Sequence, residues 1–294
     1  MTSSCKFVSL AAGTASLLCL QLFIFPDSGL THGFEHSSEL GVAKAIRTKK
    51  DVLISQTINS RISFIPPATR NPRRSQGSGS RGCNNESLAS NLVTLLIPSK
   101  EYTGQTLSGR PTFFWHLSQA ISVPIQFTLV EENVGGKTLL EKQIDAPKAG
   151  ILQVELPQDQ PELVPGQIYR WTVSLVCNPN RRSEDVFFQS WIQRVPTTPE
   201  LEQKLATVEV NSSTLEPTPA SETGSRGHES SETLRSRAAI YAQAGLWYDA
   251  LTTLYKAWNA NPQDLAVQAD FLSLLDQVGF SEVVNQERQR LAQR

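Results

Sequence analysis

Apolar and polar residues alternate along a series of short segments between residues 91 and 194. This alternation constrains the fold more than any other feature of the sequence. In the clearest case, apolar Trp171 and Val173 are separated by polar Thr172. Successive side chains of a strand point to opposite faces, so the alternation predicts half-buried antiparallel strands. Seven segments show it: 91–97, 111–117, 124–131, 137–144, 151–156, 167–177 and 185–194.

Turn-forming residues separate these segments. Glycine, proline and asparagine cluster at 109–111, 134–136, 147–150, 161–166 and 178–180, where they favour turns. Seven short strands within about 105 residues are typical of an immunoglobulin-like antiparallel β-sandwich. We therefore expect a mainly β protein with an α-helical C-terminal part, in which residues 83–196 form the β-sandwich domain.

The first 29 residues have the layout of a targeting segment. Lys6 precedes a mostly apolar run over residues 7–25, which Pro26 ends. This order indicates a secretory signal. The run of about 19 residues is also close to the length of a spanning helix, so a cleaved signal, an uncleaved inner-membrane anchor and a buried helix remain alternatives. The signal or the anchor would place the protein in the periplasm or cell envelope.

Residues 30–82 show no sustained periodicity. The stretch 66–82 is rich in proline, arginine, serine and glycine, which bury too little apolar surface to offset chain entropy. Within residues 47–82, eight basic side chains stand against Asp51 alone, although the whole chain has a net charge of −1. We expect a disordered basic linker, either solvated or attracted to an anionic envelope polymer or lipid. The near-neutral chain as a whole argues against nucleic-acid binding.

Four cysteines leave one pair outside the targeting segment. Cys5 and Cys19 lie within residues 1–29, so Cys83 and Cys177 remain in the exported part. A single pair in an oxidising compartment favours a disulfide. In the chain-entropy model, closing a loop of about 95 residues stabilises a fold by about 4–5 kcal/mol. The alternative is two separate thiols, with Cys177 acting as a small buried apolar residue.

The pattern becomes helical toward the C-terminus. A short helix is predicted at residues 199–205 and a linker at residues 208–230. Together, residues 197–230 connect the sandwich to a helical region at residues 231–294. There, one helix is expected to run from a capping serine to about Ala244. A second should run to about residue 260, where Asn261 and Pro262 stop it.

This pair of helices resembles a tetratricopeptide repeat. The residues at the positions of that motif are Ala238, Tyr241, Gly245, Trp247, Ala250, Ala257 and Pro262. Gly279 follows Gly245 by the 34 residues of the motif's period, but Val284 stands where a second unit has a small residue. Two units are fewer than a free-standing array needs, so the helices should pack on each other, on the sandwich or on a partner.

Three aromatic residues of this region have two possible roles. Trp247, Tyr248 and Trp258 all follow Gly245, in the second expected helix. They either pack in a core or line a groove that binds a protein partner.

Several motifs together resemble one known family. They are Arg81-Gly82-Cys83, Pro111-Thr112-Phe113-Phe114-Trp115, Tyr169-Arg170-Trp171, Val176-Cys177-Asn178-Pro179 with Arg182-Ser183, Trp191-Ile192-Gln193-Arg194-Val195-Pro196 and Ala244-Gly245-Leu246-Trp247-Tyr248-Asp249-Ala250-Leu251. Over about residues 81–280, the combination resembles the family called domain of unknown function 928, known chiefly from cyanobacteria. The resemblance implies an exported protein of unassigned activity, and it supplies no catalytic or ligand-binding residues.

The sequence offers little recognisable site chemistry. His116 is the one histidine of the strand-rich block, and we expect it to be a surface or edge histidine. A G-x-S-x-G elbow, a C-x-x-C pair, a phosphate loop and a calcium loop are absent from the sequence. We therefore assign no catalytic, metal-binding or cofactor-binding residue and expect the protein not to be an enzyme.

These observations favour a non-enzymatic protein–protein interaction module at the cell envelope. The alternative is a sandwich that binds carbohydrate or another envelope polymer. An exposed strip of aromatics would favour this alternative, and burial of Trp115, Trp171 and Trp191 would count against it. A third possibility is a hydrolase, which a cleft with His116 beside a carboxylate would favour.

Overall fold

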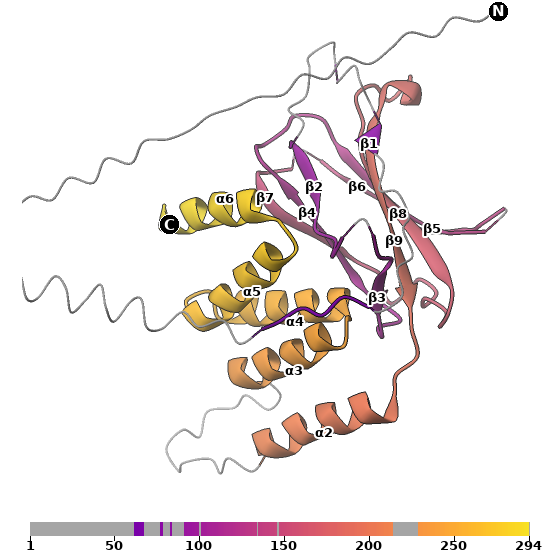
Figure 1. Ribbon diagram of the computed structural model, residues 1–294. Coiled ribbons are helices and arrows are strands. Elements are labelled where there is room, and N and C mark those ends of the chain that lie inside the picture. The colour runs from indigo at the N-terminus through magenta and orange to yellow at the C-terminus, as the bar shows by residue number, and fades with distance from the viewer. Residues whose placement is uncertain are drawn as a thin grey trace, which may run out of the picture. The chain divides into compact units, whose positions relative to one another are not determined.

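The computed structural model describes residues 62–67, 77–78, 83, 91–99, 101–133, 135–145, 147–213 and 229–293. All of them belong to one compact unit that spans residues 50–294 (Figure 1). The expected signal or anchor, including the apolar run 7–25, lies outside the described residues. So does most of the expected basic linker. Among the described helices, none combines the length and apolar character needed to cross a membrane.

Two β-sheets form the first half of the described structure. The smaller sheet has the order β2 (Val93–Leu95), β4 (Thr112–Leu117) and β7 (Gly150–Glu155). The larger one has the order β1, β9, β8, β5 and β6, with β3 also pairing with β9. Its strands are β1 (Gly77–Ser78), β3 (Gly104–Thr106), β5 (Ile125–Glu131), β6 (Thr138–Ile144), β8 (Ile168–Leu175) and β9 (Val186–Arg194).

The expected strands are confirmed, and their order is of immunoglobulin type. Each of the seven predicted segments contains one strand, whereas β1 and β3 are too short to show an alternation. The first, second and fifth predicted strands share one sheet, and the third, fourth, sixth and seventh share the other. This is the immunoglobulin partition with the fourth strand, β6, paired with β5 in the position of strand C′ of variable-type domains. The Tyr169 hydroxyl accepts a hydrogen bond from the Val164 amide at 2.9 Å, which resembles the tyrosine corner of such sandwiches.

Aromatic side chains join the two sheets. Phe113 and Trp115 project from β4, while Phe127 and Trp171 project from the facing strands. The Phe113 ring lies 5.1 Å from Phe127 and 5.4 Å from Trp171, centroid to centroid. All four side chains are fully buried. The alternating apolar face of each strand therefore forms the sandwich core.

Five helices follow the sheets. They are α2 (Pro199–Ser213), α3 (Ser231–Gln243), α4 (Trp247–Ala260), α5 (Leu265–Gln277) and α6 (Ser281–Ala292). The helix α2 continues well beyond the predicted end at residue 205, into the expected linker. Ser230 caps α3 by accepting a hydrogen bond from the Thr233 amide at 3.1 Å, as a capping serine should. Gly245 and Gly279 both adopt positive φ, at +77° and +91°, after α3 and α5.

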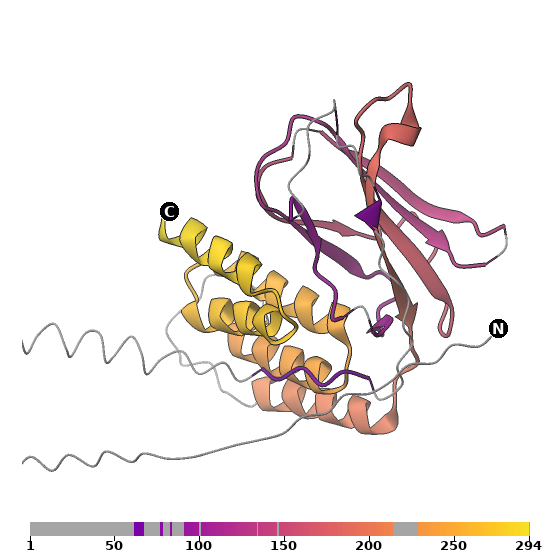
Figure 2. The same ribbon diagram turned by 45° about the horizontal axis from the view of Figure 1, so that its top comes forward.

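Helices α4 and α6 lie against the outer face of the smaller sheet, as Figures 1 and 2 show, and α2 lies farther away, beside α3. All six residues of β4 are buried, so this strand is covered on both faces. Phe114 contacts Tyr255 of α4 at a ring-centroid distance of 5.1 Å, and His116 contacts Glu287 of α6. The prediction of a surface or edge histidine is wrong, because this helical layer removes the side chain of His116 from solvent.

Two side chains anchor α4 to the sheets. The indole N–H of Trp247 donates to the Leu96 carbonyl at 2.9 Å. The Tyr248 hydroxyl accepts from the indole N–H of Trp171 at 3.0 Å. A Cβ at Gly104 would lie 2.5 Å from the Tyr248 ring, so this position on β3 has room only for glycine. The helical layer and the sandwich therefore share one hydrophobic core.

The predicted disulfide is confirmed. Cys83 and Cys177 are bonded, with their Cα atoms 4.8 Å apart. The strand β8 ends at Leu175, two residues earlier than predicted, and Cys177 is half-buried in the turn that follows. The bond therefore ties the chain that precedes β2 to the end of β8.

Candidate functional site

An extended segment of the chain lies across the helical layer. This segment, Ile62–Pro67, is called the strap below, and it passes along the helices in both ribbon views. It falls within the region expected to be a disordered linker. Ile62 is only 5% exposed, whereas Ile65 is 54% exposed. The described part of this region is therefore packed rather than free, because one of its few apolar clusters meets the helices.

Gln277, at the end of α5, holds the strap by its backbone. The side-chain amide donates to the Ile62 carbonyl at 3.0 Å and accepts from the Phe64 amide at 2.9 Å. These two groups flank Ser63, so one amide side chain pairs with extended backbone much as a neighbouring strand would. The Ile65 amide donates at 3.0 Å to the Ala242 carbonyl near the end of α3, which also accepts from the Gly245 amide at 3.1 Å.

Phe64 provides the side-chain contact of the strap. Its ring meets Trp247 edge-on, with the ring centroids 5.1 Å apart. A Cβ at Gly245 would lie 3.2 Å from the Ile65 carbonyl oxygen, so the residue that turns the chain after α3 also admits the strap. Ala242, Gly245, Trp247 and Gln277 are called the peptide groove below. Helices α3 and α5 carry Ala242 and Gln277 of this groove. An ion pair of 2.6 Å between Arg235 of α3 and Asp270 of α5 joins these two helices.

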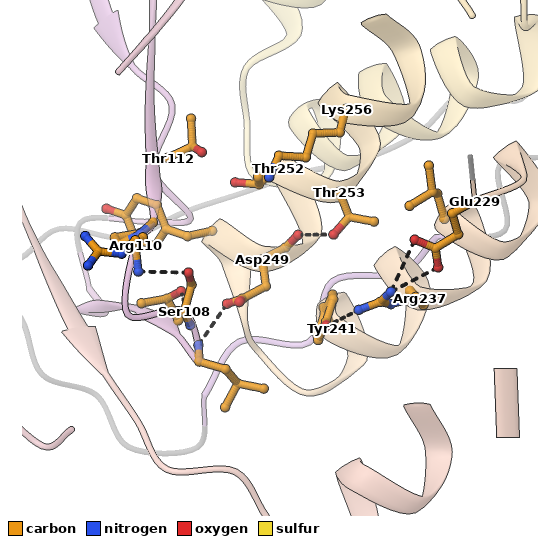
Figure 3. A pocket seen from close by; sticks show the side chains of 15 residues that line it. Ser108, Arg110, Thr112, Glu229, Arg237, Tyr241, Asp249, Thr252, Thr253 and Lys256 are labelled. Atoms are coloured by element: carbon orange, nitrogen blue, oxygen red, sulfur yellow. Dashed lines mark hydrogen bonds and ion pairs between the residues drawn. The ribbon is translucent and has the colours of Figure 1, made fainter. Parts of the chain in front are cut away.

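A polar cavity lies between the sandwich and helices α3 and α4 (Figure 3). Its volume is about 430 Å³. Its walls come from the loop after β3, the start of β4 and the facing turns of the two helices. The polar residues that line it are Thr106, Ser108, Arg110, Thr112, Glu229, Arg237, Tyr241, Asp249, Thr252, Thr253 and Lys256.

Asp249 fixes the loop that forms one wall of the polar cavity. Its carboxylate accepts the Leu107 amide at 3.1 Å, and Thr106 and Ser108 also bond to it. Burial raises the pKa of Asp249 to about 6, although these hydrogen bonds act in the opposite direction. The carboxyl group therefore joins α4 to the sandwich and titrates near neutral pH.

Two buried polar atoms of the cavity wall have no hydrogen-bond partner in the structure. They are Oγ1 of Thr112, a residue that is 1% exposed, and Nε of Arg237. The other guanidinium nitrogens of Arg237 bond to Glu229 at 3.0 Å and to Tyr241 at 3.4 Å. An unsatisfied buried polar group costs about 1–3 kcal/mol. Both atoms are shielded from solvent, so a molecule in the cavity would form a hydrogen bond with either of them after a small rotation of its side chain.

Arg110 lines the same cavity but is already occupied. Its guanidinium donates to the carbonyls of Pro157 and Gln160 at 2.6 and 2.7 Å. In Figure 3 its end points away from Asp249 and Thr252. Arg110 therefore stabilises the wall of the polar cavity, and its guanidinium does not point into the cavity.

His116 and Glu287 form a second polar cluster, between β4 and α6. His116 Nε2 lies 3.1 Å from Glu287 Oε1, and Arg290 donates to the same oxygen at 2.7 Å. A cavity of about 190 Å³ adjoins Glu287 and Arg290. The hydrolase interpretation needs a cleft that contains His116 beside a carboxylate, but His116 is buried and does not line this cavity. The described lining of this cavity contains no serine, threonine or cysteine, so it lacks the nucleophile of a triad.

The structure places the three aromatic residues selected from the sequence in different environments. Trp247 and Tyr248 are 0% and 1% exposed, in the shared core, as the core-packing interpretation expects. Trp258 is half-buried, packs against Phe271 at 5.1 Å and lines the cavity beside Glu287. Among the residues that the structure describes, no group of histidine, cysteine and carboxylate side chains could hold a metal ion.

No sequence pattern predicted the contact between Gln277 of the peptide groove and Phe64 of the strap. Gln277 is one of several glutamines near the C-terminus, and Phe64 lies in a segment without periodicity. Asp249 had a weak signal, because it stands within the Ala244–Leu251 motif. Such roles depend on contacts between residues more than 200 positions apart, as with Phe64 and Gln277.

The described residues form a two-part structure: an immunoglobulin-type sandwich that carries a helical layer with an extended segment held against it. The chain belongs to the family described as Domain of Unknown Function (DUF928), whose model matches residues 76–216 and 208–288. The match includes both sheets and Gln277, whereas the strap precedes its first residue. Comparison with the curated proteins found no match.

Proposed function

We propose that this protein is a non-enzymatic interaction module of the cell envelope, which binds an extended segment of a partner protein in the peptide groove. The observation that carries the proposal is the pairing of Gln277 with the backbone of Ile62 and Phe64. Hydrogen bonds to backbone groups recognise an extended chain regardless of its side chains. The groove therefore suits segments other than the strap.

Some contacts in the peptide groove provide affinity for any extended chain, and one contact selects the side chain. The three backbone hydrogen bonds, two to Gln277 and one to Ala242, contribute about 0.5–1.5 kcal/mol each. The edge-on contact of Phe64 with Trp247 adds about 0.5–1.5 kcal/mol and selects an aromatic residue. The strap is tethered to the groove, so its high effective concentration keeps it bound even when its contacts are weak. Contact energies of this modest size therefore suit a strap that a partner can replace.

Several further features support this function. The groove lies within the family match and the strap lies outside it, as expected of a domain and a separable ligand. The helix pairs resemble tetratricopeptide units, a scaffold for binding peptides. The disulfide is typical of an oxidising compartment, which supports export to the periplasm or cell envelope.

The basic segment suggests a supplementary contact. Residues 47–82 carry a charge of +7, from eight basic residues and Asp51. We propose that this arm attracts an anionic envelope polymer or lipid, which would hold the module near the surface where its protein partner lies.

The alternative function is polymer binding by the sandwich, for which we expected an exposed strip of aromatic side chains. Trp115 and Trp171 are fully buried and Trp191 is half-buried. Trp115 and Trp171 are therefore unavailable as a stacking platform, whereas Trp191 keeps part of its surface exposed.

In-cell cross-linking of tagged protein tests the proposal. We compare the full chain with Phe64→Ala, which weakens the strap, and with Phe64→Ala combined with Gln277→Ala. The first variant should gain one reproducible partner, and the second should lose it. Gln268→Ala, on the same helix α5, is the matched control in the Phe64→Ala background and should retain the partner. Partner sets that are identical in all variants would overturn the proposal.

A further inference from the structure

We propose that the polar cavity is a second binding site, independent of the peptide groove, for a small ligand that carries a carboxylate and several hydroxyls, of the sugar-acid type. The juxtaposition that carries the proposal is the unpartnered hydroxyl of Thr112 on β4 facing the helix that bears Thr252 and Lys256 (Figure 3).

The size and the walls of the cavity define the kind of ligand. Its volume of about 430 Å³ lies in the range of sites for small molecules. Such sites are mostly apolar, but this one is lined largely by hydroxyl and charged side chains. The walls therefore suit a ligand that is polar over most of its surface, and they disfavour a lipid or an aromatic compound.

The carboxylates of the wall are already engaged. Glu229 accepts two hydrogen bonds from Arg237, at 3.0 and 3.2 Å. Asp249 accepts from the backbone of the loop after β3. Because both carboxylates already accept hydrogen bonds, the wall has little capacity left to accept hydrogen bonds from a ligand.

The groups that remain are mainly donors. Nε of Arg237 is buried and unpartnered. Lys256 reaches only Glu155, at 3.8 Å, and both side chains are more than half exposed, so this surface pair is weak. The hydroxyl of Thr112 can donate or accept. Two cationic donors with a buried hydroxyl match a carboxylate next to hydroxyl groups.

The position of these groups explains why the ligand should bridge the two layers. Thr112 begins β4, Lys256 lies on α4 and Arg237 lies on α3. In Figure 3 the hydroxyl of Thr112 points across the cavity toward Thr252. A ligand that bonds to all three elements would couple the sandwich to the helices.

Isothermal titration of the full exported chain with three probes tests the site. The probes are D-glucuronate, D-glucose as a neutral sugar of similar size, and acetate as a carboxylate without hydroxyls. We expect glucuronate to bind at least about tenfold more tightly than either of the others, because only it satisfies both kinds of donor. Equal affinity for glucose would overturn the role of the carboxylate, and equal affinity for acetate would overturn the role of the hydroxyls.

Two variants locate the binding in the polar cavity. Thr112→Val removes the hydroxyl while keeping the shape, and Lys256→Met removes the charge. Each should weaken glucuronate binding by about fivefold to tenfold. The melting temperature of free Thr112→Val should stay the same or rise, because the lost hydroxyl has no partner. Lys142→Met, on β6, is the control. Absence of binding by all probes, or affinities that neither cavity variant changes, would overturn the proposal.

Discussion

The hydroxyl of Tyr248 accepts a hydrogen bond from the indole nitrogen of Trp171, 3.0 Å away in the buried core. Tyr248 belongs to α4 and Trp171 to β8, so this bond joins the helical layer to the centre of the larger sheet. Burial raises the pKa of Tyr248 above its usual range, so the phenol stays protonated. The sandwich and the helices should therefore unfold together.

Tyr248→Phe tests this coupling. The change leaves the Trp171 indole nitrogen buried without an acceptor, so we expect a loss of about 1–3 kcal/mol in the free energy of unfolding. Urea unfolding followed separately by fluorescence and by circular dichroism should show one shared, lowered midpoint. Tyr255→Phe, at a half-buried position of the same helix, should change little. Two separate transitions in the wild-type chain would contradict the coupling.

Gln277→Ala tests the peptide groove directly. A labelled peptide with the sequence of residues 61–68 should bind to the Phe64→Ala protein, whose own strap is weakened. Adding Gln277→Ala removes two backbone hydrogen bonds, so binding should weaken about tenfold or more. Fluorescence anisotropy measures both affinities. The Gln268→Ala variant should bind like its parent, and equal affinities for all three proteins would refute the groove.

Reduction of the disulfide should destabilise the fold. The Cys83–Cys177 bond closes a loop with a sequence separation of 94 residues, and loss of such a bond typically costs about 2–5 kcal/mol. Urea midpoints with and without dithiothreitol measure the change. The Cys83→Ser/Cys177→Ser variant should have the lower midpoint without dithiothreitol and should match the reduced wild type in its presence. A wild-type midpoint that does not respond to the reductant, while thiol labelling shows complete reduction, would contradict this expectation.

Asp249 should make the protein more stable at mildly acidic pH. Burial raises its pKa in the folded state from an ordinary value of 3.8 to about 6. Between these values the folded chain binds a proton that the unfolded chain does not, so the free energy of unfolding rises as the pH falls through this window. The contribution amounts to about 2 kcal/mol between pH 7 and pH 4.

The comparison of wild type with Asp249→Asn isolates this effect. Urea midpoints measured from pH 4 to pH 7.5 should converge at the acid end and diverge toward neutral pH, where the variant should be the more stable protein. Asp159→Asn, on an exposed loop, serves as the control and should run parallel to wild type. Parallel curves for Asp249→Asn and wild type would show that this carboxyl does not titrate as described.

Local patterns determined much of the architecture. The alternation in segments such as 111–117 and 167–177 is visible because each strand has one face in the sandwich core, and such a face needs only neighbours two residues apart. Gly245 and Gly279 mark helix ends for an equally local reason, since both adopt positive φ. The disulfide followed from counting cysteines.

Contacts between distant segments decided the rest. His116 is polar and alternates with Trp115, so the sequence places it on a solvent face, but α6 brings Glu287 onto that face from 171 positions away. The peptide groove and the polar cavity arise in the same way, from α3, α4 and α5 docking on each other and on β4. Periodicity shows which side of an element is apolar, but only the packing of whole elements decides which polar residues meet. For this reason the sequence by itself determined seven of the nine described strands, the ends of α3 and α5 and the cysteine pair, and the tertiary structure alone created the sites.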